Sequence, residues 1–221
     1  MSREKVVCLV SGGIDSPVSM ALAAREFDVL PLHFCLYPYT CEDSFLVAMN
    51  VLEDIRKTAD FEKAIVYPWS KILRTIMGGQ DKSYACLECR RSMFRVAELV
   101  CEREGASGII TGESLGQKAT QTLSNLWATS SGIKFPVLRP LLGLDKLEIE
   151  RLSKRLGIWH EVHAGCCYAT PKYPRTRSGP AEVDAMLKGL KLDELIMGQF
   201  GNVLEVRSFK EDFVSYLESL V

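Results

Sequence analysis

Short apolar runs alternate along the chain with segments in which apolar residues recur on one helical side. The runs predict buried strands, and the recurring apolar sides predict packed helices. The expected strands are residues 6–10, 28–36, 64–69 and 108–112, with an extended segment at 137–142. The expected helices are residues 16–26, 43–59, 71–77, 90–104, 117–129 and 145–156. This alternation predicts an α/β fold, a doubly wound parallel sheet with helices on both faces.

The pattern changes near the C-terminus. Residues 164–180 are rich in proline, glycine, threonine and basic residues, which indicates a loop or linker. We therefore expect a main domain at residues 1–178 and a small C-terminal α/β extension at 179–221. The extension is predicted to hold two short helices, a strand at 203–209 and a last helix at 211–220.

Composition and charge narrow the class of protein. Hydrophobic residues make up 47% and charged residues 25% of the 221 residues, which is typical of a globular protein. The 27 Lys and Arg residues against 28 Asp and Glu residues exclude nucleic-acid binding through bulk positive charge, although not through a local patch. No apolar run is long enough to span a membrane and no signal peptide is recognisable, so a cytoplasmic protein is expected.

The chain contains 8 cysteines, and their surroundings differ. Cytoplasmic thiols stay reduced, so disulfides are not expected. Cys8 lies in an apolar run and Cys101 on a helical face, which favours ordinary core positions. Four other cysteines lie beside turns and polar residues, which makes them candidates for metal binding or catalysis. They are Cys86, Cys89, Cys166 and Cys167.

The strongest local motif directly follows the first expected strand. Its sequence is Ser11-Gly12-Gly13-Ile14-Asp15-Ser16. The glycines let backbone N–H groups converge on phosphate oxygens, and the following helix adds its positive N-terminal end. Ser11 and Ser16 add hydroxyl donors, and Asp15 is suited to hold Mg²⁺ or its waters. This position at the carboxyl edge of a sheet favours a phosphate site over a simple capped turn.

This hexapeptide resembles the SGGxDS loop of the PP-loop ATP pyrophosphatases, which cleave ATP to AMP and pyrophosphate. Several later segments resemble the adenylation domain of one branch, the tRNA 4-thiouridine synthetases (ThiI). These segments are Thr111-Gly112-Glu113-Ser114-Leu115-Gly116-Gln117, Thr120-Gln121-Thr122-Leu123, Pro136-Val137-Leu138-Arg139-Pro140-Leu141 and Asp145-Lys146-Leu147-Glu148-Ile149. Cys166-Cys167 followed by residues 171–176 resembles the loop after that domain, so the likeness covers roughly residues 5–180.

The resemblance implies roles for individual residues. Ser11, Gly12, Gly13, Asp15 and Ser16 would hold the phosphates of ATP with Mg²⁺. Gly112, Gln117 and Gln121 would lie near the nucleotide or the uracil, and Lys146 would face the polyphosphate or the adenylated intermediate. Without the resemblance, Lys146 would be interpreted as a solvated lysine at a helix start. His33 is expected to be a hydrogen-bonded core residue rather than a base.

The segment Cys86-Leu87-Glu88-Cys89 is a CxxC motif, which by itself fits half a zinc site, a redox pair or part of an iron–sulfur site. Some 4-thiouridine synthetases carry such a motif together with a cysteine in the later loop. The resemblance therefore implies a 4Fe–4S cluster held by Cys86, Cys89 and Cys167, with Cys166 as the alternative to Cys167. Thiol or persulfide chemistry at Cys167 without metal, and a structural zinc ion, remain alternatives.

Two expectations concern domains that this family often carries. The phosphate loop begins at residue 11, so we expect no N-terminal THUMP domain for tRNA binding, and we expect no C-terminal rhodanese domain. Sulfur would then come from the cluster, from sulfide or from a separate donor protein. Basic patches would contact tRNA unless a separate tRNA-binding protein does so. The candidates are Lys172, Arg175 and Arg177 with Tyr168 and Tyr173, and a second group of Lys82, Arg90, Arg91 and Arg95.

Together these features predict an ATP-dependent sulfurtransferase. It would adenylate O4 of a uracil, in tRNA, and replace that oxygen with sulfur to form 4-thiouridine. Asp15, Lys146 and Cys167 are the expected catalytic residues. One alternative is a PP-loop enzyme that thiolates or amidates a small molecule. Another is a non-catalytic nucleotide- or metal-binding subunit of a tRNA-modifying complex. The family resemblance also predicts a homodimer.

Overall fold

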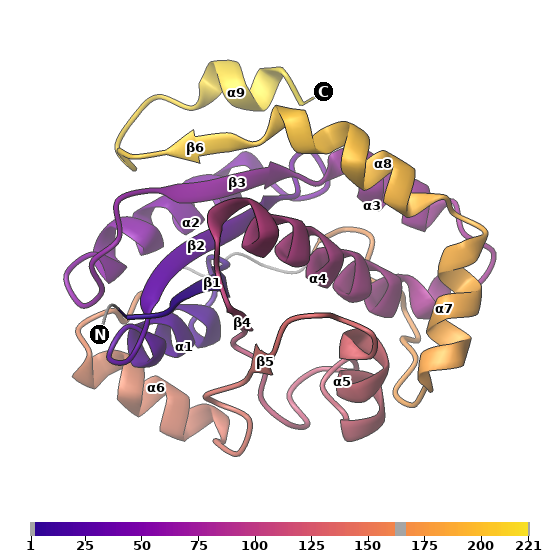
Figure 1. Cartoon of the computed structure of the whole chain (residues 1–221), viewed down its shortest axis with the longest axis horizontal. Coiled ribbons are helices and arrows are strands. Elements are labelled where there is room, and N and C mark those ends of the chain that lie inside the picture. Colours follow the sequence, from indigo (N-terminus) through magenta and orange to yellow (C-terminus); the bar gives the residue numbers. More distant parts are fainter. Residues whose placement is uncertain (1–2, 162–166, 221) are drawn as a thin grey trace.

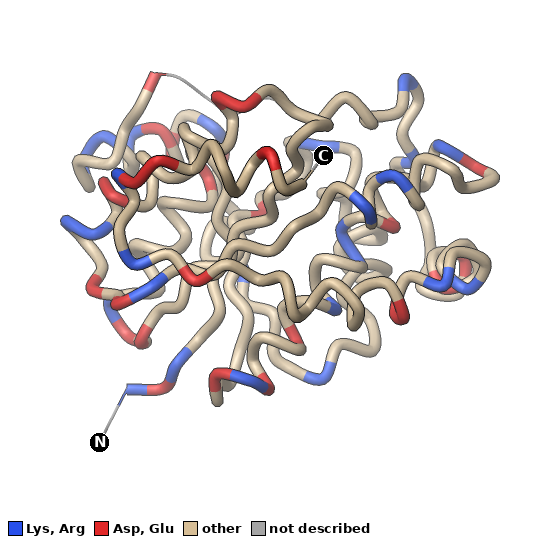
Figure 2. Tube along the Cα trace, turned by 90° about the horizontal axis from the view of Figure 1, so that it is seen from above, with Lys and Arg blue, Asp and Glu red and all other residues tan. Residues whose placement is uncertain are grey.

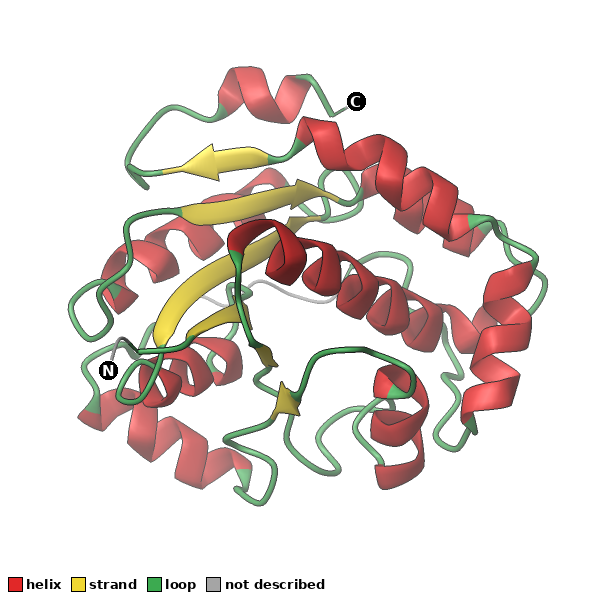
Figure 3. Ribbon diagram, viewed as in Figure 1, coloured by secondary structure: helices red, strands yellow, loops and turns green. Residues whose placement is uncertain are grey.

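The computed structural model describes residues 3–161 and 167–220, and within these residues the strands form one 6-stranded sheet (Figures 1 and 3). The strand order is β5-β4-β1-β2-β3-β6. The strands are β1 (Lys5–Leu9), β2 (Asp28–Cys35), β3 (Ala64–Pro68), β4 (Gly108–Ile110), β5 (Val137–Leu138) and β6 (Leu204–Val206). Neighbouring strands from β5 to β3 pair in parallel, and β6 pairs antiparallel with β3.

Helices cover both faces of this sheet, which confirms the predicted doubly wound α/β fold (Figure 1). Because side chains alternate along a strand, Val6 and Cys8 of β1 pack on one face and Val7 and Leu9 on the other. The first face is covered by α1 (Asp15–Ala23) and α2 (Glu42–Ile55), and the second by α3 (Ser70–Met77) and α4 (Ala85–Glu104).

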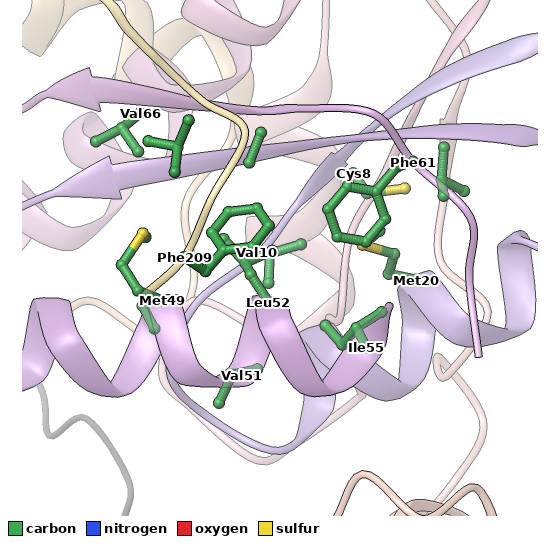
Figure 4. Close-up of a cluster of buried hydrophobic side chains, with 14 of the residues drawn as sticks. Cys8, Val10, Met20, Met49, Val51, Leu52, Ile55, Phe61, Val66 and Phe209 are labelled. Carbon is green, nitrogen blue, oxygen red and sulfur yellow. The ribbon is translucent and has the colours of Figure 1, made fainter. Parts of the chain in front are cut away.

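Figure 4 shows the first of these two layers in detail. The side chains of Met49, Leu52 and Ile55 lie between α2 and the sheet, beside Val10 and Phe209. All five side chains are at most 4% exposed, so each is almost completely removed from water and stabilises the fold accordingly. Phe209 belongs to the C-terminal extension, which therefore shares this core with the N-terminal strands.

The strand order changes direction at β1. From β1 the chain moves outward to β2 and β3, then returns to place β4 on the other side of β1. The loops that leave β1 and β4 therefore diverge to opposite faces and leave a crevice at the carboxyl ends of these strands. Ligands of open α/β sheets bind at such switch points, and the loop at residues 11–16 lies at this one.

The starts of two helices differ from the sequence prediction by five or six residues. The helix expected from Arg90 begins at Ala85, because Asp81 caps a 3₁₀ turn, η1 (Lys82–Tyr84), that leads straight into α4. The CxxC motif therefore lies in the first turns of a helix. The helix expected at 117–129 is reduced to α5 (Leu123–Ser130), because Thr122 caps its start by accepting a hydrogen bond from the Asn125 backbone N–H.

The helix expected at 145–156 is α6 (Lys146–Arg155). Asp145 and Glu148 form a capping box at its start, and Gly157 follows its end with a left-handed φ of 71°. Gly105 ends α4 in the same way, as predicted, with a φ of 65°. The start of α6 is thus set by local side-chain bonds, which matters because Lys146 is its first residue.

The C-terminal extension contains the predicted elements. They are α7 (Pro180–Lys188), α8 (Leu192–Gln199), η2 (Phe200–Asn202), β6 and α9 (Val214–Glu218). Helix α8 contributes Leu192 and Ile196 to the second core layer, and β6 with α9 extends the first. Within the described residues, no helix is both long and apolar enough to cross a bilayer.

Candidate active site

The loop between β1 and α1 is held in shape by its own polar groups. The Ser11 backbone N–H donates to Ser16 Oγ at 2.8 Å, and the Ser11 and Ser16 hydroxyl oxygens are 3.0 Å apart. The Gly13 backbone N–H donates to Ser11 Oγ at 3.3 Å. These bonds tie the two ends of the loop together, so the loop is organised before any ligand arrives.

Gly112 supports this loop from the end of β4. A Cβ atom at this position would lie 2.5 Å from the Ser16 backbone nitrogen and 2.7 Å from the Asp15 carbonyl carbon. Both neighbours are backbone atoms of the first turn of α1, so neither can rotate away. Only glycine lets the two segments approach this closely.

Two side chains from the region around α6 also reach the loop. Lys146 Nζ lies 2.6 Å from Asp15 Oδ1. His160 Nε2 lies 3.2 Å from the Gly12 carbonyl oxygen. The lysine was predicted from the family resemblance, whereas His160 was missed. A lone histidine after a helix carries no sequence signal of such a contact.

A cavity of about 380 Å³ opens beside the loop, at the carboxyl ends of β1 and β2. It brings together most of the predicted site residues from four separate segments. Its lining includes Ser11, Gly12, Gly13, Asp15, Ser16, His33, Cys86, Cys89, Arg90, Gly112, Gln121 and Cys167. Gln117 is not among the lining residues, because its side chain turns to donate to Ser114 Oγ at 3.1 Å.

Two polar side chains of the cavity wall differ in their hydrogen bonding. His33 Nδ1 lies 3.0 Å from the Val10 carbonyl oxygen, as expected of a satisfied core residue, and burial lowers the pKa of His33 to about 4. Gln121 is 9% exposed, and its Oε1 atom has no hydrogen-bond partner among the described residues. An unpartnered buried amide at a cavity wall is suited to receive a ligand donor.

The cysteines fall into the two predicted groups. Cys8 and Cys101 are each 1% exposed inside the core. Cys86, Cys89 and Cys167 are half-buried and line the cavity. Cys166 lies outside the described residues.

The CxxC cysteines are presented to the cavity by the first turns of α4. The Trp69 indole N–H donates to Cys89 Sγ at 3.2 Å. Burial is the main cause that raises the pKa of Cys89 to about 12, and the nearby Cys167 and Cys86 add to it. Cys89 is thus a neutral thiol in the protein alone, and a bound metal or cation would be needed to favour its thiolate.

Glu113 forms a buried ion cluster at the same edge of the sheet, which sequence reasoning missed. Its carboxylate accepts from Arg90 Nε at 2.9 Å and from Arg139 Nε at 2.8 Å. Burial raises the pKa of Glu113, but the two guanidinium groups outweigh it, so the pKa is lowered and the carboxylate stays charged. Arg90, a member of the second expected basic patch, is thus paired with a buried carboxylate.

Two further members of that expected patch are paired with carboxylates as well. Arg91 pairs with Asp184, and Arg95 pairs with Glu98 and Asp193. Figure 2 shows basic and acidic residues interspersed along the whole trace, in line with the near-zero net charge.

The other expected patch keeps its aromatic residues on the surface. Tyr168 is 71% and Tyr173 is 75% exposed, and Lys172 Nζ lies 5.4 Å from the centre of the Tyr173 ring. Arg175 is turned back onto the Tyr84 ring at 4.8 Å. Cys167 lines the cavity, and Tyr168 is the next residue in the chain. An exposed aromatic residue therefore directly follows a residue of the cavity wall.

Comparison with known proteins supports the resemblance of the motifs. The family profile described as "Thiamine biosynthesis protein (ThiI)" matches residues 1–192. A Methanobrevibacter smithii protein named "Probable tRNA sulfurtransferase" is 35% identical over 208 residues, covering 91% of this chain and 54% of that protein. The chain thus spans about half the length of the curated relatives it matches.

Two solved structures extend this comparison to the fold. A 4-thiouridine synthetase crystallised with RNA and bound ATP has a TM-score of 0.82 and 33% identity, covering 92% of this chain and 55% of that one. A U34-tRNA thiolase from Methanococcus maripaludis, solved with its 4Fe–4S cluster, has a TM-score of 0.54 and 14% identity over 90% of this chain and 72% of that one, a likeness of fold alone. The profile match over most of the sequence, together with these relatives, shows that the chain belongs to the ThiI family.

Proposed function

We propose that this protein activates a uracil carbonyl in tRNA with ATP and replaces its oxygen with sulfur, forming 4-thiouridine. The observation that carries this proposal is the shared cavity. The phosphate loop and the thiols of Cys86, Cys89 and Cys167 line one space, so an activating nucleotide and a sulfur source would meet there. The related structure with bound ATP and RNA supports the same assignment.

In the activation step, uracil O4 would attack the α-phosphate of ATP and pyrophosphate would leave. The backbone N–H groups of the loop at 11–16 and the N-terminal end of α1 would bind the pyrophosphate oxygens. Asp15 is the candidate ligand of Mg²⁺ or its waters, with Lys146 beside it as a second positive charge. Such preorganised charges stabilise a leaving group as its charge develops.

In the second step, sulfur would replace the activated oxygen at C4. Three cysteine thiols surround the cavity, although no three ligating side chains of the described residues are arranged to hold one metal ion. Cysteine thiols are the ligands of a 4Fe–4S cluster, and Cys86, Cys89 and Cys167 would hold it at this cavity. When bound, such a cluster would offer one iron without a cysteine ligand as a carrier of sulfide.

The surface next to Cys167 is the proposed contact for tRNA. Tyr168 and Tyr173 are exposed aromatic rings on which unstacked bases can lie, and Lys172 adds a positive charge. The rest of the surface has no excess of basic residues, so we expect weak tRNA affinity for this chain alone.

The test is a reaction with anaerobically purified protein, unmodified tRNA transcript, ATP, Mg²⁺ and sulfide. We expect AMP, pyrophosphate and 4-thiouridine in equal amounts. Nucleoside mass spectrometry measures the 4-thiouridine. Cys86→Ala should abolish 4-thiouridine and lower the iron and acid-labile sulfide content, whereas Cys41→Ser, at an exposed position, should change neither. Pyrophosphate release without tRNA and with a small carbonyl compound would instead indicate a small-molecule substrate.

A further inference from the structure

His160 connects the segment after α6 with the phosphate loop. Its Nε2 atom lies 3.2 Å from the Gly12 carbonyl oxygen, although 148 positions separate the two residues. A carbonyl oxygen can only accept, so the half-buried ring donates this hydrogen bond from Nε2. Its Nδ1 atom lies 3.3 Å from the Ile158 carbonyl oxygen, and this second contact helps to orient the ring.

Core packing holds the backbone around His160 against the loop. Ile158 is 3% exposed and belongs to a hydrophobic cluster that also contains Ile14, a residue of the loop itself. Trp159 packs against the same cluster, which joins α6 to α1 (Figure 1). The backbone that carries His160 is therefore anchored to the element that the loop leads into.

The carbonyl group that His160 contacts belongs to the peptide between the two loop glycines. This peptide is trans, so the Gly12 C=O and the Gly13 N–H point in opposite directions. With the Gly12 oxygen turned to His160, the Gly13 N–H turns to the side of Ser11, where it donates to Oγ at 3.3 Å. Ser11 and Gly13 both line the cavity.

The orientation of this peptide decides which charge the loop presents to a phosphate. Backbone N–H groups attract phosphate oxygens, whereas a carbonyl oxygen in the same place would repel them. Neither Gly12 nor Gly13 has a Cβ atom, so the peptide between them can rotate with little steric resistance. A contact from outside the loop is therefore an effective way to hold one orientation, and His160 supplies such a contact.

We propose that His160 is a positioning residue that keeps the Gly12–Gly13 peptide in the orientation that binds pyrophosphate. This inference rests on the proposed function, in which the loop holds the pyrophosphate part of ATP. His160 acts through Gly12 and not through a contact with the substrate. The affinity for ligands that carry pyrophosphate should therefore depend on His160, and the affinity for adenosine should not.

The test measures the binding of magnesium pyrophosphate, ATP and adenosine by titration calorimetry. His160→Phe keeps a ring of similar size and removes the N–H donor. We expect it to weaken the binding of pyrophosphate and ATP by roughly 10-fold, as for a lost hydrogen bond, and to leave adenosine binding unchanged. His160→Gln keeps a side-chain N–H donor, so its affinities should stay within about threefold of wild type.

The order of the two variants separates positioning from packing. If only the volume of the ring mattered, His160→Phe would bind pyrophosphate better than His160→Gln, and the proposal would be overturned. An equal loss of adenosine binding, or an unchanged pyrophosphate affinity in His160→Phe, would overturn it as well. A wild-type protein that bound neither ATP nor pyrophosphate would instead refute the proposed function.

Discussion

Lys146 Nζ lies 2.6 Å from Asp15 Oδ1, although the two residues are separated by 131 positions. Asp15 is the first residue of α1 and belongs to the phosphate loop, and Lys146 is the first residue of α6 and follows the capping residue Asp145. The two helices thus present opposite charges to each other through their first residues. The side chains of Asp15 and Lys146 are 21% and 44% exposed, so the pair adds little to stability. We propose that this pair, which lies beside the loop, handles phosphate.

Lys146→Met should therefore lower turnover rather than stability. Removal of a charge that stabilises the developing leaving group is expected to slow pyrophosphate release by roughly 100-fold. The free energy of unfolding should change by less than about 1 kcal/mol. Pyrophosphate release measures turnover, and urea unfolding measures stability. The control is Arg151→Met, which removes a positive charge from an exposed position of the same helix and should leave both quantities unchanged. A large loss of stability with normal turnover would show a purely structural lysine.

Gly112→Ala should disturb the phosphate loop from behind. The added Cβ would lie 2.5 Å from the Ser16 backbone nitrogen, so the start of α1 must move. We expect a loss of about 1–3 kcal/mol in the free energy of unfolding, as for other overpacked sites, and a large loss of ATP affinity. Gly143→Ala is the control, because its added Cβ meets no atom within 4 Å. Normal ATP affinity in Gly112→Ala would contradict the close approach of the two segments.

His33 should make the protein sensitive to mild acid. Burial lowers its pKa from 6.5 to about 4, so the unfolded chain binds a proton at this residue at higher pH than the folded one. The free energy of unfolding should therefore fall as the pH drops from about 6.5 towards 4. Between pH 7 and 5 this group accounts for about 2 kcal/mol. Urea unfolding at both pH values should show that His33→Gln loses less stability than wild type, and identical losses would refute a neutral buried histidine.

Phe209→Ala tests whether the C-terminal extension folds with the main domain. Phe209 is 3% exposed and packs among α2 and the sheet strands, so its truncation should cost about 3–5 kcal/mol. One cooperative transition shifted to lower temperature is expected in calorimetry. Val214→Ala, at a position 46% exposed, should leave the transition in place. Two separate transitions, with only one of them shifted, would mean that residues 179–221 unfold independently.

Local sequence determined most of the secondary structure and the phosphate loop. The apolar runs of β1 to β3 had to be buried strands, because only a sheet covered on both faces accepts residues that are apolar throughout. The loop at 11–16 was recognisable because glycine backbone freedom and hydroxyl donors belong to the residues themselves. The start of α4 was misjudged because Asp81 acts through a short 3₁₀ turn that has no strong periodicity.

Tertiary structure decided which residues line the cavity. Cys86 and Cys167 line the same cavity as the phosphate loop, which no spacing in the sequence expresses. Arg90 is indistinguishable in sequence from the neighbouring Arg91, yet the two turn to different carboxylates, Glu113 and Asp184. The carboxylate that an arginine reaches depends on which distant segments pack against its helix, and this packing is a property of the whole fold.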